Sequence, residues 1–184
     1  MSLTKTPICN FGEKAKDFNL ISTNNEEINL EKIKGENGTL IMFICNHCPY
    51  VKAIIKDVVE DVNFLSKLGI KSAAIMSNDV KNYPDDSFEN MISFSKLNKF
   101  SFPYLYDETQ NVARSYGAVC TPDFFGYNKN FELQYRGRIR ELKNLKPVRN
   151  DVSDLRHAME MVTKTGNGPK NQVASMGCNI KWFK

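Results

Sequence analysis

The sequence has no long apolar run, no cluster of charges of one sign and no internal repeat. No stretch approaches the roughly 18–20 apolar residues of a transmembrane helix, and we recognise no secretory signal. The 25 Lys and Arg residues are interleaved with 21 Asp and Glu, for a formal net charge of +4. Nucleic-acid and membrane surfaces need clustered basic residues. We therefore expect neither as a partner, and we take the cytoplasm as the default location.

Cysteine is also sparse. A disulfide-stapled secreted scaffold would be shorter and richer in cysteine than these 184 residues, which suffice for one domain with its own core. Only two of the five cysteines are close in sequence, Cys45 and Cys48. In a reducing compartment, a Cys-x-x-Cys inside a β–α pattern indicates redox chemistry first and metal binding second.

The apolar pattern around this pair predicts a strand followed by a helix. Residues 40–44 form a short continuous apolar run, as in a central strand that is covered on both faces. From Val51 to Leu68 apolar residues recur at helical spacing, with Pro49 in the first turn and Gly69 at the end. The Cys-x-x-Cys therefore lies where a buried strand passes into an amphipathic helix.

The rest of the chain alternates strands and helices, which predicts an α/β domain with a mixed sheet and helices on both faces. We expect residues 1–166 to form this domain and residues 167–184 to form a tail that docks through its apolar end. Further strands are expected at 17–23, 27–29, 73–76, 104–106, 124–127 and 133–137, and further helices at 88–97, 109–116 and from 152 to a stop at Gly166.

A strand-to-helix junction suits thiol chemistry. The thiolate is the nucleophile, and the unpaired N–H groups and dipole of a helix N-terminus favour the anion. One thiol then attacks a substrate and the other resolves the mixed disulfide. We predict Cys45 as the more exposed, attacking thiol and Cys48 as the resolving thiol inside the first helical turn. His47 between them should lower the thiol pKa and make the couple more oxidising.

Pro122 is the second candidate element of the site. It begins a predicted strand directly after Thr121, just before the final strand pair. Only ~5% of X–Pro bonds in folded proteins are cis, so the residues alone predict a trans bond. Its place in the chain is nevertheless that of the loop that faces Cys-x-x-Cys in thioredoxin folds.

Several segments together resemble thioredoxin-like proteins of the peroxiredoxin-like, redoxin-domain family (alkyl hydroperoxide reductase/thiol-specific antioxidant-like). The resemblance runs from about Ala15 to the end and is carried by residues 43–51, 77–79, 83–87, 102–110, 117–124 and 177–182. It implies a thioredoxin fold with an N-terminal strand extension and a C-terminal tail. It also implies that Cys45 and Cys48 match the two thioredoxin cysteines, that Pro122 matches the cis-proline, and that Thr121 and Pro122 dock a substrate chain through backbone hydrogen bonds.

The departures from the family patterns bear on the activity. A His before the second Cys is similar to the disulfide-forming members of the superfamily. Peroxiredoxins carry Pro-x-x-x-Thr-x-x-Cys and a later Arg. If Cys48 is matched to their Cys, Ile41 and Cys45 stand at the Pro and Thr positions and no Arg lies near Thr121. Arg114 lies on a predicted helix.

Other residues leave alternatives open. Cys120 could be a third thiol, a metal ligand or a small buried residue, and Cys178 could be an extra resolving thiol or an inert residue of the docked tail. The acidic loop with Asp79, Asp85 and Asp86 could be a turn and helix cap or could face substrate.

From the sequence we therefore predict a thiol–disulfide oxidoreductase without a cofactor or a resident metal. Its partners would be a protein or small-molecule disulfide or thiol and an unknown reductant. The alternatives are a peroxiredoxin-like peroxide reductase with an antioxidant role, and a metal-binding or metal-delivery module that uses Cys45, His47 and Cys48.

Overall fold

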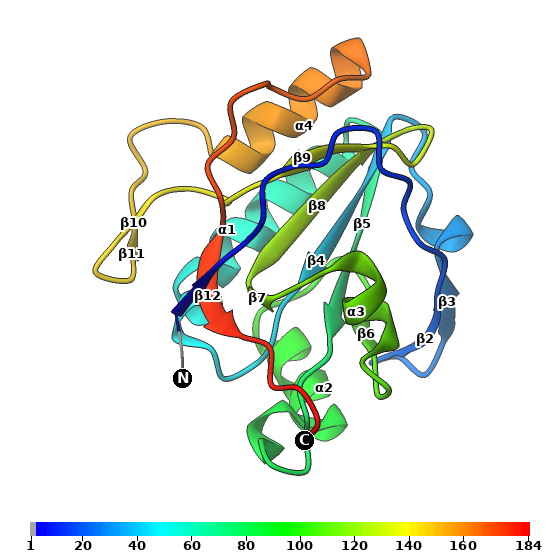
Figure 1. The fold of residues 1–184 in the computed structure, drawn as a ribbon, viewed down its shortest axis with the longest axis vertical. Coiled ribbons are helices and arrows are strands. Elements are labelled where there is room, and N and C mark those ends of the chain that lie inside the picture. The colour runs from blue at the N-terminus through cyan, green and yellow to red at the C-terminus, as the bar shows by residue number, and fades with distance from the viewer. Residues whose placement is uncertain (1–2) are drawn as a thin grey trace.

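A seven-stranded mixed sheet forms the centre of the computed structural model, which describes residues 3–184 (Figure 1). The strand order is β3-β2-β6-β5-β4-β8-β9, and the β4–β5 and β5–β6 pairs are parallel. The other pairs are antiparallel. The strands are β2 (Asn19–Ser22), β3 (Glu27–Asn29), β4 (Gly38–Phe43), β5 (Ile70–Met76), β6 (Tyr104–Tyr106), β8 (Asp123–Asn128) and β9 (Leu133–Arg136).

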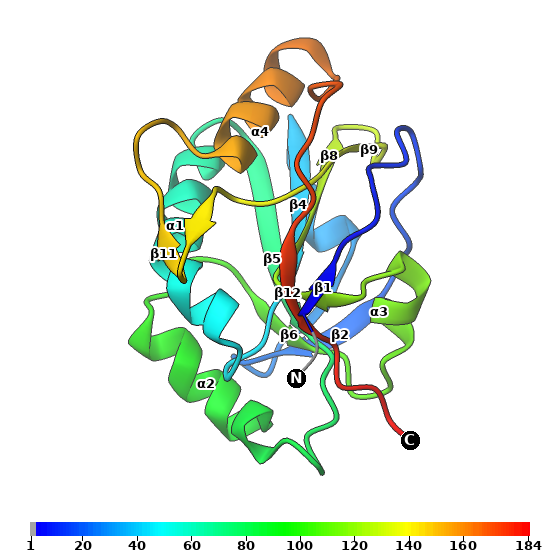
Figure 2. The same ribbon diagram turned by 60° about the vertical axis from the view of Figure 1, so that its left-hand side comes forward.

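Helices cover both faces of this sheet, as the sequence predicts (Figure 2). Successive residues of a strand point to opposite faces. Leu40 and Met42 of β4 accordingly pack with α1, α2 and α4, while Ile41 and Phe43 pack with α3. The helices are α1 (Pro49–Ser66), α2 (Phe88–Leu97), α3 (Asn111–Tyr116) and α4 (Asp154–Thr165), with one-turn 3-10 helices at Glu31–Ile33 and Pro84–Asp86.

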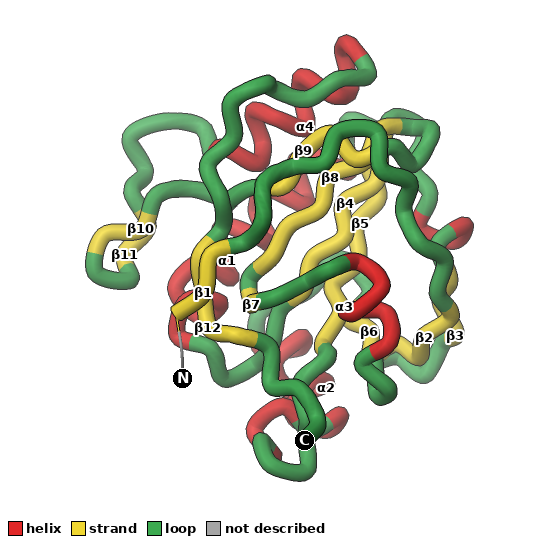
Figure 3. The backbone as a smooth tube through the Cα atoms, viewed as in Figure 1, coloured by secondary structure: helices red, strands yellow, loops and turns green. Residues whose placement is uncertain are grey.

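The two ends of the chain meet in a second, three-stranded sheet that sequence reasoning missed (Figure 3). Its order is β1 (Leu3–Lys5), β12 (Met176–Asn179) and β7 (Cys120–Thr121), and both pairs are antiparallel. A separate two-stranded sheet joins β10 (Leu142–Lys143) to β11 (Lys146–Pro147). The C-terminal tail therefore lies against the domain beside the start of β8.

The observed bounds differ from the predicted ones by a few residues. β4 runs from Gly38 to Phe43, and α1 begins at Pro49, which we had placed in its first turn, and ends at Ser66. Ser87 and Ser153 cap the N-termini of α2 and α4 by accepting backbone N–H bonds. No helix in residues 3–184 is long and apolar enough to cross a membrane.

Candidate active site

The Cys-x-x-Cys spans the junction between β4 and α1. Cys48 is the N-cap residue of α1, with an extended backbone (φ −64°, ψ 124°), and Pro49 is the first helical residue. Proline suits this position because the N–H that it lacks would have no partner within the helix. Cys48 therefore precedes the first turn, where we had placed it inside. Cys45 is not the exposed thiol that we expected, since both residues are buried, with 1% and 0% of their surface exposed.

Cys45 and Cys48 lie in the same core cluster, and both are free thiols whose ionisations affect each other. A hydrogen bond from the Cys45 thiol lowers the pKa of Cys48 well below its ordinary value, against the opposing effect of burial. The backbone N–H of Val51 and the Cys178 thiol add to this stabilisation. The pKa of Cys45 is raised by the same bond to Cys48, then by burial, and then by the charge of Asp86. The thiolate is therefore favoured at Cys48.

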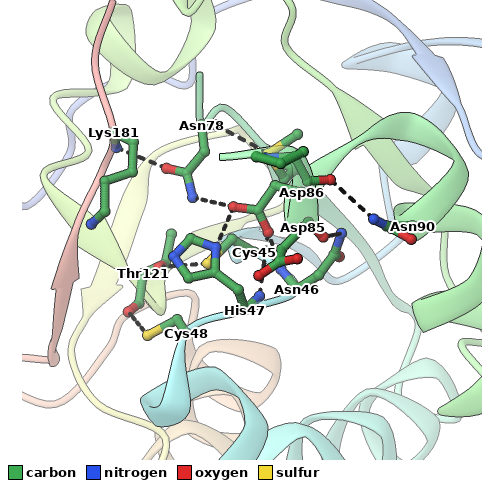
Figure 4. Close-up of polar contacts among 12 residues, drawn as sticks. Cys45, Asn46, His47, Cys48, Asn78, Asp85, Asp86, Asn90, Thr121 and Lys181 are labelled. Carbon is green, nitrogen blue, oxygen red and sulfur yellow. Dashed lines mark hydrogen bonds and ion pairs between the residues drawn. The ribbon is translucent and has the colours of Figure 1, made fainter. Parts of the chain in front are cut away.

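Thr121 lies across from both cysteines, and the Thr121–Pro122 bond is cis, as the resemblance implies. The hydroxyl Oγ1 of Thr121 is 3.2 Å from Sγ of Cys45, and the carbonyl oxygen of Thr121 is 3.3 Å from Sγ of Cys48 (Figure 4). The carbonyl accepts a hydrogen bond from Cys48 only while that thiol is protonated. The donors from Cys45, Val51 and Cys178 outweigh this contact.

His47 forms an ion pair with Asp86, and not a direct hydrogen bond to a sulfur. Its Nδ1 atom is 2.6 Å from Oδ2 of Asp86, and its ring stacks on Tyr83 with centroids 5.9 Å apart and an interplanar angle of 9°. The carboxylate raises the pKa of His47 above its ordinary value, against the effect of burial. Nε2 of His47 is buried and has no hydrogen-bond partner in the described part of the chain.

Asp86, which the sequence analysis left open as either a turn residue or a substrate-facing acid, belongs to the site through its pairing with His47. Its side chain is fully buried and accepts hydrogen bonds from the backbone N–H of Asn46 (2.7 Å) and from Nδ2 of Asn78 (2.7 Å), besides the bond from His47. Burial alone would raise the pKa of Asp86, but these bonds lower it below its ordinary value. The sequence feature that could have pointed to Asp86 is its place in residues 83–87, one of the segments that resemble the redoxin-domain family.

The other two acids of that loop have local roles. The Asp79 carboxylate accepts backbone N–H groups of its own loop, from Lys81 and Asn82, and the carbonyl oxygen of Asp85 accepts from Nδ2 of Asn46 at 3.1 Å. Of the two alternatives for this loop, the turn fits Asp79 and Asp85. Asp86 alone of these three reaches the His47 ring.

Three side chains could together hold a metal ion. Cys45, His47 and Asp86 each offer one ligand atom, and these atoms lie within 4.8 Å of one another. The sequence had suggested Cys45, His47 and Cys48 as metal ligands, and the structure has Asp86 in place of Cys48. Thiolate, imidazole and carboxylate are all zinc ligands. In this structure Nδ1 of His47 and the Asp86 carboxylate bind each other, and Nε2 of His47 is the ring nitrogen without a partner among the described residues.

The remaining thiols differ in their distance from the pair. Cys178 lies on β12 opposite Thr121, and its thiol hydrogen-bonds the Cys48 sulfur. Burial, followed by this bond, raises the pKa of Cys178 to about 11. Cys120 is buried with its sulfur 3.8 Å from the carbonyl oxygen of Pro122, and burial raises its pKa. Cys9 is half-buried, and burial raises its pKa to about 11.

The structure corrects one further expectation. Thr121 does not offer a free backbone edge to a substrate chain, because β12 already pairs with β7 there, with Cys178 opposite Thr121. Arg114 lies on a helix, α3, as expected, and stacks over the ring of Trp182 in the tail, with its guanidinium carbon 4.3 Å from the ring centroid.

A hollow of about 770 Å³ opens beside His47, between α1 and α2. This volume is typical of small-molecule sites. Its lining combines apolar side chains with exposed lysines, and includes Asn46, His47, Lys52, Lys56, Phe94 and Leu97.

Comparisons with known proteins agree with this fold. Residues 11–142 match the model of the AhpC/TSA family. An uncharacterised conserved protein from Geobacillus kaustophilus is 36% identical, with a TM-score of 0.94 over 100% of this chain and 97% of that protein. A hypothetical protein from Sinorhizobium meliloti is 35% identical, with a TM-score of 0.90 over 98% of each chain.

A more distant structure is the thioredoxin domain of a thiol-disulfide oxidoreductase from Bacteroides vulgatus. It is 15% identical, with a TM-score of 0.58 over 73% of this chain and 89% of that one, and shows the likeness of fold alone. No curated protein sequence matches the chain. The expected α/β thioredoxin-like fold, with its mixed central sheet and flanking helices, is confirmed.

Proposed function

This chain belongs to the AhpC/TSA family of thioredoxin-like proteins, and on that premise we propose that it is a thiol–disulfide oxidoreductase with Cys45 and Cys48 as its redox pair. The observation that carries the proposal is that both thiols, at the junction before α1, contact the same residue, Thr121, whose bond to Pro122 is cis. This arrangement suits a pair that can pass between dithiol and disulfide.

The lowered pKa of Cys48 and the raised pKa of Cys45 favour roles opposite to those expected from the sequence. The Cys48 thiolate attacks one sulfur of a substrate disulfide, and the other substrate sulfur leaves as a thiol after taking a proton. Cys45 then loses its proton and attacks the Cys48 sulfur, which releases the second substrate thiol and leaves a Cys45–Cys48 disulfide. An external thiol reductant returns the pair to the dithiol.

The His47–Asp86 pair tunes this couple. The charge of His47 and the Cys48 thiolate stabilise each other, and the Asp86 carboxylate keeps His47 charged. Stabilising the thiolate stabilises the reduced protein, so the couple is the more oxidising. A reduction potential less negative than the ~−270 mV of thioredoxin is expected.

Burial of both sulfurs supports a small substrate. The β7 edge, where an extended chain would dock, is occupied by β12. We place a small disulfide or thiol substrate in the hollow beside His47, where Lys52 and Lys56 at the wall favour an anionic one.

Redox titration against glutathione tests the proposal. The Cys45–Cys48 pair should oxidise as one two-electron couple, and disulfide reductase turnover should be lost in Cys48→Ser and in Cys45→Ser. Cys9→Ser is the matched control, because Cys9 lies outside the contacting thiols, and it should keep full activity. A pair that never oxidises, or full activity in Cys48→Ser, would contradict the proposal.

Peroxide reduction is the second candidate, favoured by the low pKa of Cys48 directly before Pro49. The Cys48 thiolate would attack one peroxide oxygen, giving a sulfenic acid at Cys48 and an alcohol or water. The Cys45 thiol would then form the disulfide with loss of water. Rapid consumption of hydrogen peroxide with a trapped sulfenic acid at Cys48 would support this candidate, and slow, non-selective oxidation of all five thiols would rule it out.

A further inference from the structure

The C-terminal strand β12 lies in the place of a substrate chain, and we propose that its Cys178 is a third redox thiol, which exchanges with the Cys45–Cys48 disulfide. The disulfide then moves to Cys48–Cys178 and ties the tail to the site. This inference rests on the redox pair proposed above. It adds a catalytic thiol and makes the chain its own disulfide partner.

The first support is the strand register. β12 lies between β1 and β7, with Cys178 opposite Leu3 on one side and opposite Thr121 on the other. Thr121 is the residue that contacts both Cys45 and Cys48. Pairing with this residue therefore places Cys178 in the same core cluster as Cys45 and Cys48, and the Cys178 thiol affects the ionisation of Cys48.

The second support is Gly177, which allows the strand to approach this closely. A Cβ atom on Gly177 would lie 2.0 Å from the carbonyl oxygen of Thr121 and 3.0 Å from Cδ of Pro122. Any side chain larger than hydrogen would push β12 away from β7. Ser175, two residues earlier, donates a hydrogen bond from Oγ to the carbonyl oxygen of Pro122 at 2.7 Å.

The third support is that the tail is also held beyond Cys178. The backbone N–H of Lys181 donates to Oδ1 of Asn78 at 2.8 Å, and Nδ2 of the same Asn78 donates to Asp86 (Figure 4). Gln110 donates to the carbonyl oxygen of Lys181 at 2.8 Å. Cys178 is thus fixed from both sides, and Asn78 links the tail to the acid that pairs with His47.

The exchange needs no external oxidant. Cys178 loses its proton and attacks the Cys48 sulfur, the Cys48–Cys178 bond forms, and the Cys45–Cys48 bond breaks. Cys45 leaves as a thiolate and takes up the proton, so the protein stays oxidised by two electrons. Cys48 is the shared sulfur because it contacts both Cys45 and Cys178.

Disulfide mapping tests the proposal. The full chain is oxidised with oxidised glutathione, its free thiols are alkylated in acid, and the peptides are assigned by mass spectrometry. The wild type should contain both Cys45–Cys48 and Cys48–Cys178, and Cys45→Ser should contain Cys48–Cys178. Cys9→Ser should match the wild type. If Cys48 of Cys45→Ser carries only glutathione while Cys178 stays free, the third thiol is overturned although the redox pair stands.

A second variant tests the strand without altering any thiol. Gly177→Ala should keep the Cys45–Cys48 disulfide and lose Cys48–Cys178, whereas Met176→Ala, which shortens an exposed side chain of the same strand, should keep both. An undiminished Cys48–Cys178 bond in Gly177→Ala would overturn the role of β12. If Gly177→Ala does not fold, the Cys45→Ser result decides. Failure of the wild type to form any Cys45–Cys48 disulfide would instead refute the redox pair itself.

Discussion

Nδ1 of His47 lies 2.6 Å from Oδ2 of Asp86, and these two residues, 39 positions apart, hold a buried ion pair beside the redox thiols. The side chain of His47 is 10% exposed and that of Asp86 is fully buried. The pair joins the Cys-x-x-Cys segment to the 3-10 helix at Pro84–Asp86. The charge of His47, beside Cys48, therefore depends on the segment Pro84–Asp86, which contains no cysteine.

Replacing Asp86 by Asn should lower the pKa of His47. The carboxylate is the main cause that raises this pKa, and burial, which opposes it, would remain. The pKa should fall below the ordinary value of about 6.5, as followed by NMR of the imidazole. Asp85→Asn is the matched control, one residue away, and should leave the His47 titration unchanged. An unaltered His47 pKa in Asp86→Asn would contradict the ion pair.

The same pair should make stability depend on pH. The raised pKa of His47 adds stability that is complete below about pH 6.5 and is lost as pH rises through the folded-state value. The lowered pKa of Asp86 adds stability that is complete above about pH 4 and is lost in acid. The Tm difference between wild type and His47→Gln should therefore be largest between about pH 4 and 6.5. A difference that does not vary with pH would refute this linkage.

Replacing Cys45 by Ala should raise the pKa of Cys48. The Cys45 thiol donates the hydrogen bond that contributes most to the stability of the Cys48 thiolate, and alanine has no donor. Thiolate absorbance near 240 nm and the rate of alkylation should both shift to higher pH. Cys45→Ser retains a hydroxyl donor and should shift less. Loss of the thiolate in Cys45→Ala together with its retention in Cys48→Ser would mean that Cys45 carries the charge.

Asp123, which follows Pro122, should be essential for stability. Its fully buried carboxylate accepts hydrogen bonds from the side chain of Arg136, at 2.9 Å from Nη2. Asp123→Ala leaves that buried guanidinium without its partner, which costs about 3–5 kcal/mol. Urea unfolding measures the loss, and Glu132→Ala, at an exposed ion pair with Lys14, should change stability little. Equal losses in the two variants would contradict this ranking.

Removing metal should leave thiol exchange unchanged. In the set formed by Cys45, His47 and Asp86, the imidazole and the carboxylate already bind each other, and exchange needs only the sulfurs. Dialysis against EDTA followed by the reductase assay, with elemental analysis of the protein before and after, measures this. Stoichiometric zinc that EDTA removes, together with a loss of turnover, would favour the metal-binding alternative.

The periodic parts of the fold could be predicted from the sequence. The apolar run at 40–44 reflects a strand that is buried on both faces, and the helical spacing from Val51 reflects a helix that is buried on one face. Both elements occur in the structure, with their ends shifted by a few residues. The first residue of α1 could also have been predicted from the sequence. Proline is favoured as the first residue of a helix, so Pro49 already indicated that Cys48 would be the cap.

Two features of the site could not be predicted because they depend on contacts between distant segments. β7 has two residues and β12 has four, too few for an alternating pattern, and their pairing depends on the register of Thr121 with Cys178. Asp86 looked like an ordinary loop acid in the sequence because the four donors to its carboxylate come from residues 46, 47 and 78, which are distant or in another segment.

The position of β12 also matters for incomplete chains. Because β12 follows Cys48 and Pro122 in the sequence, a ribosome completes the Cys45–Cys48 segment, Thr121 and Pro122 before it makes β12. Until then β7 is an unpaired edge beside reactive thiols, and such edges promote aggregation. A nascent chain that lacks β12 would therefore be exposed to wrong disulfides and to association with other strands, and synthesis of β12 removes both hazards.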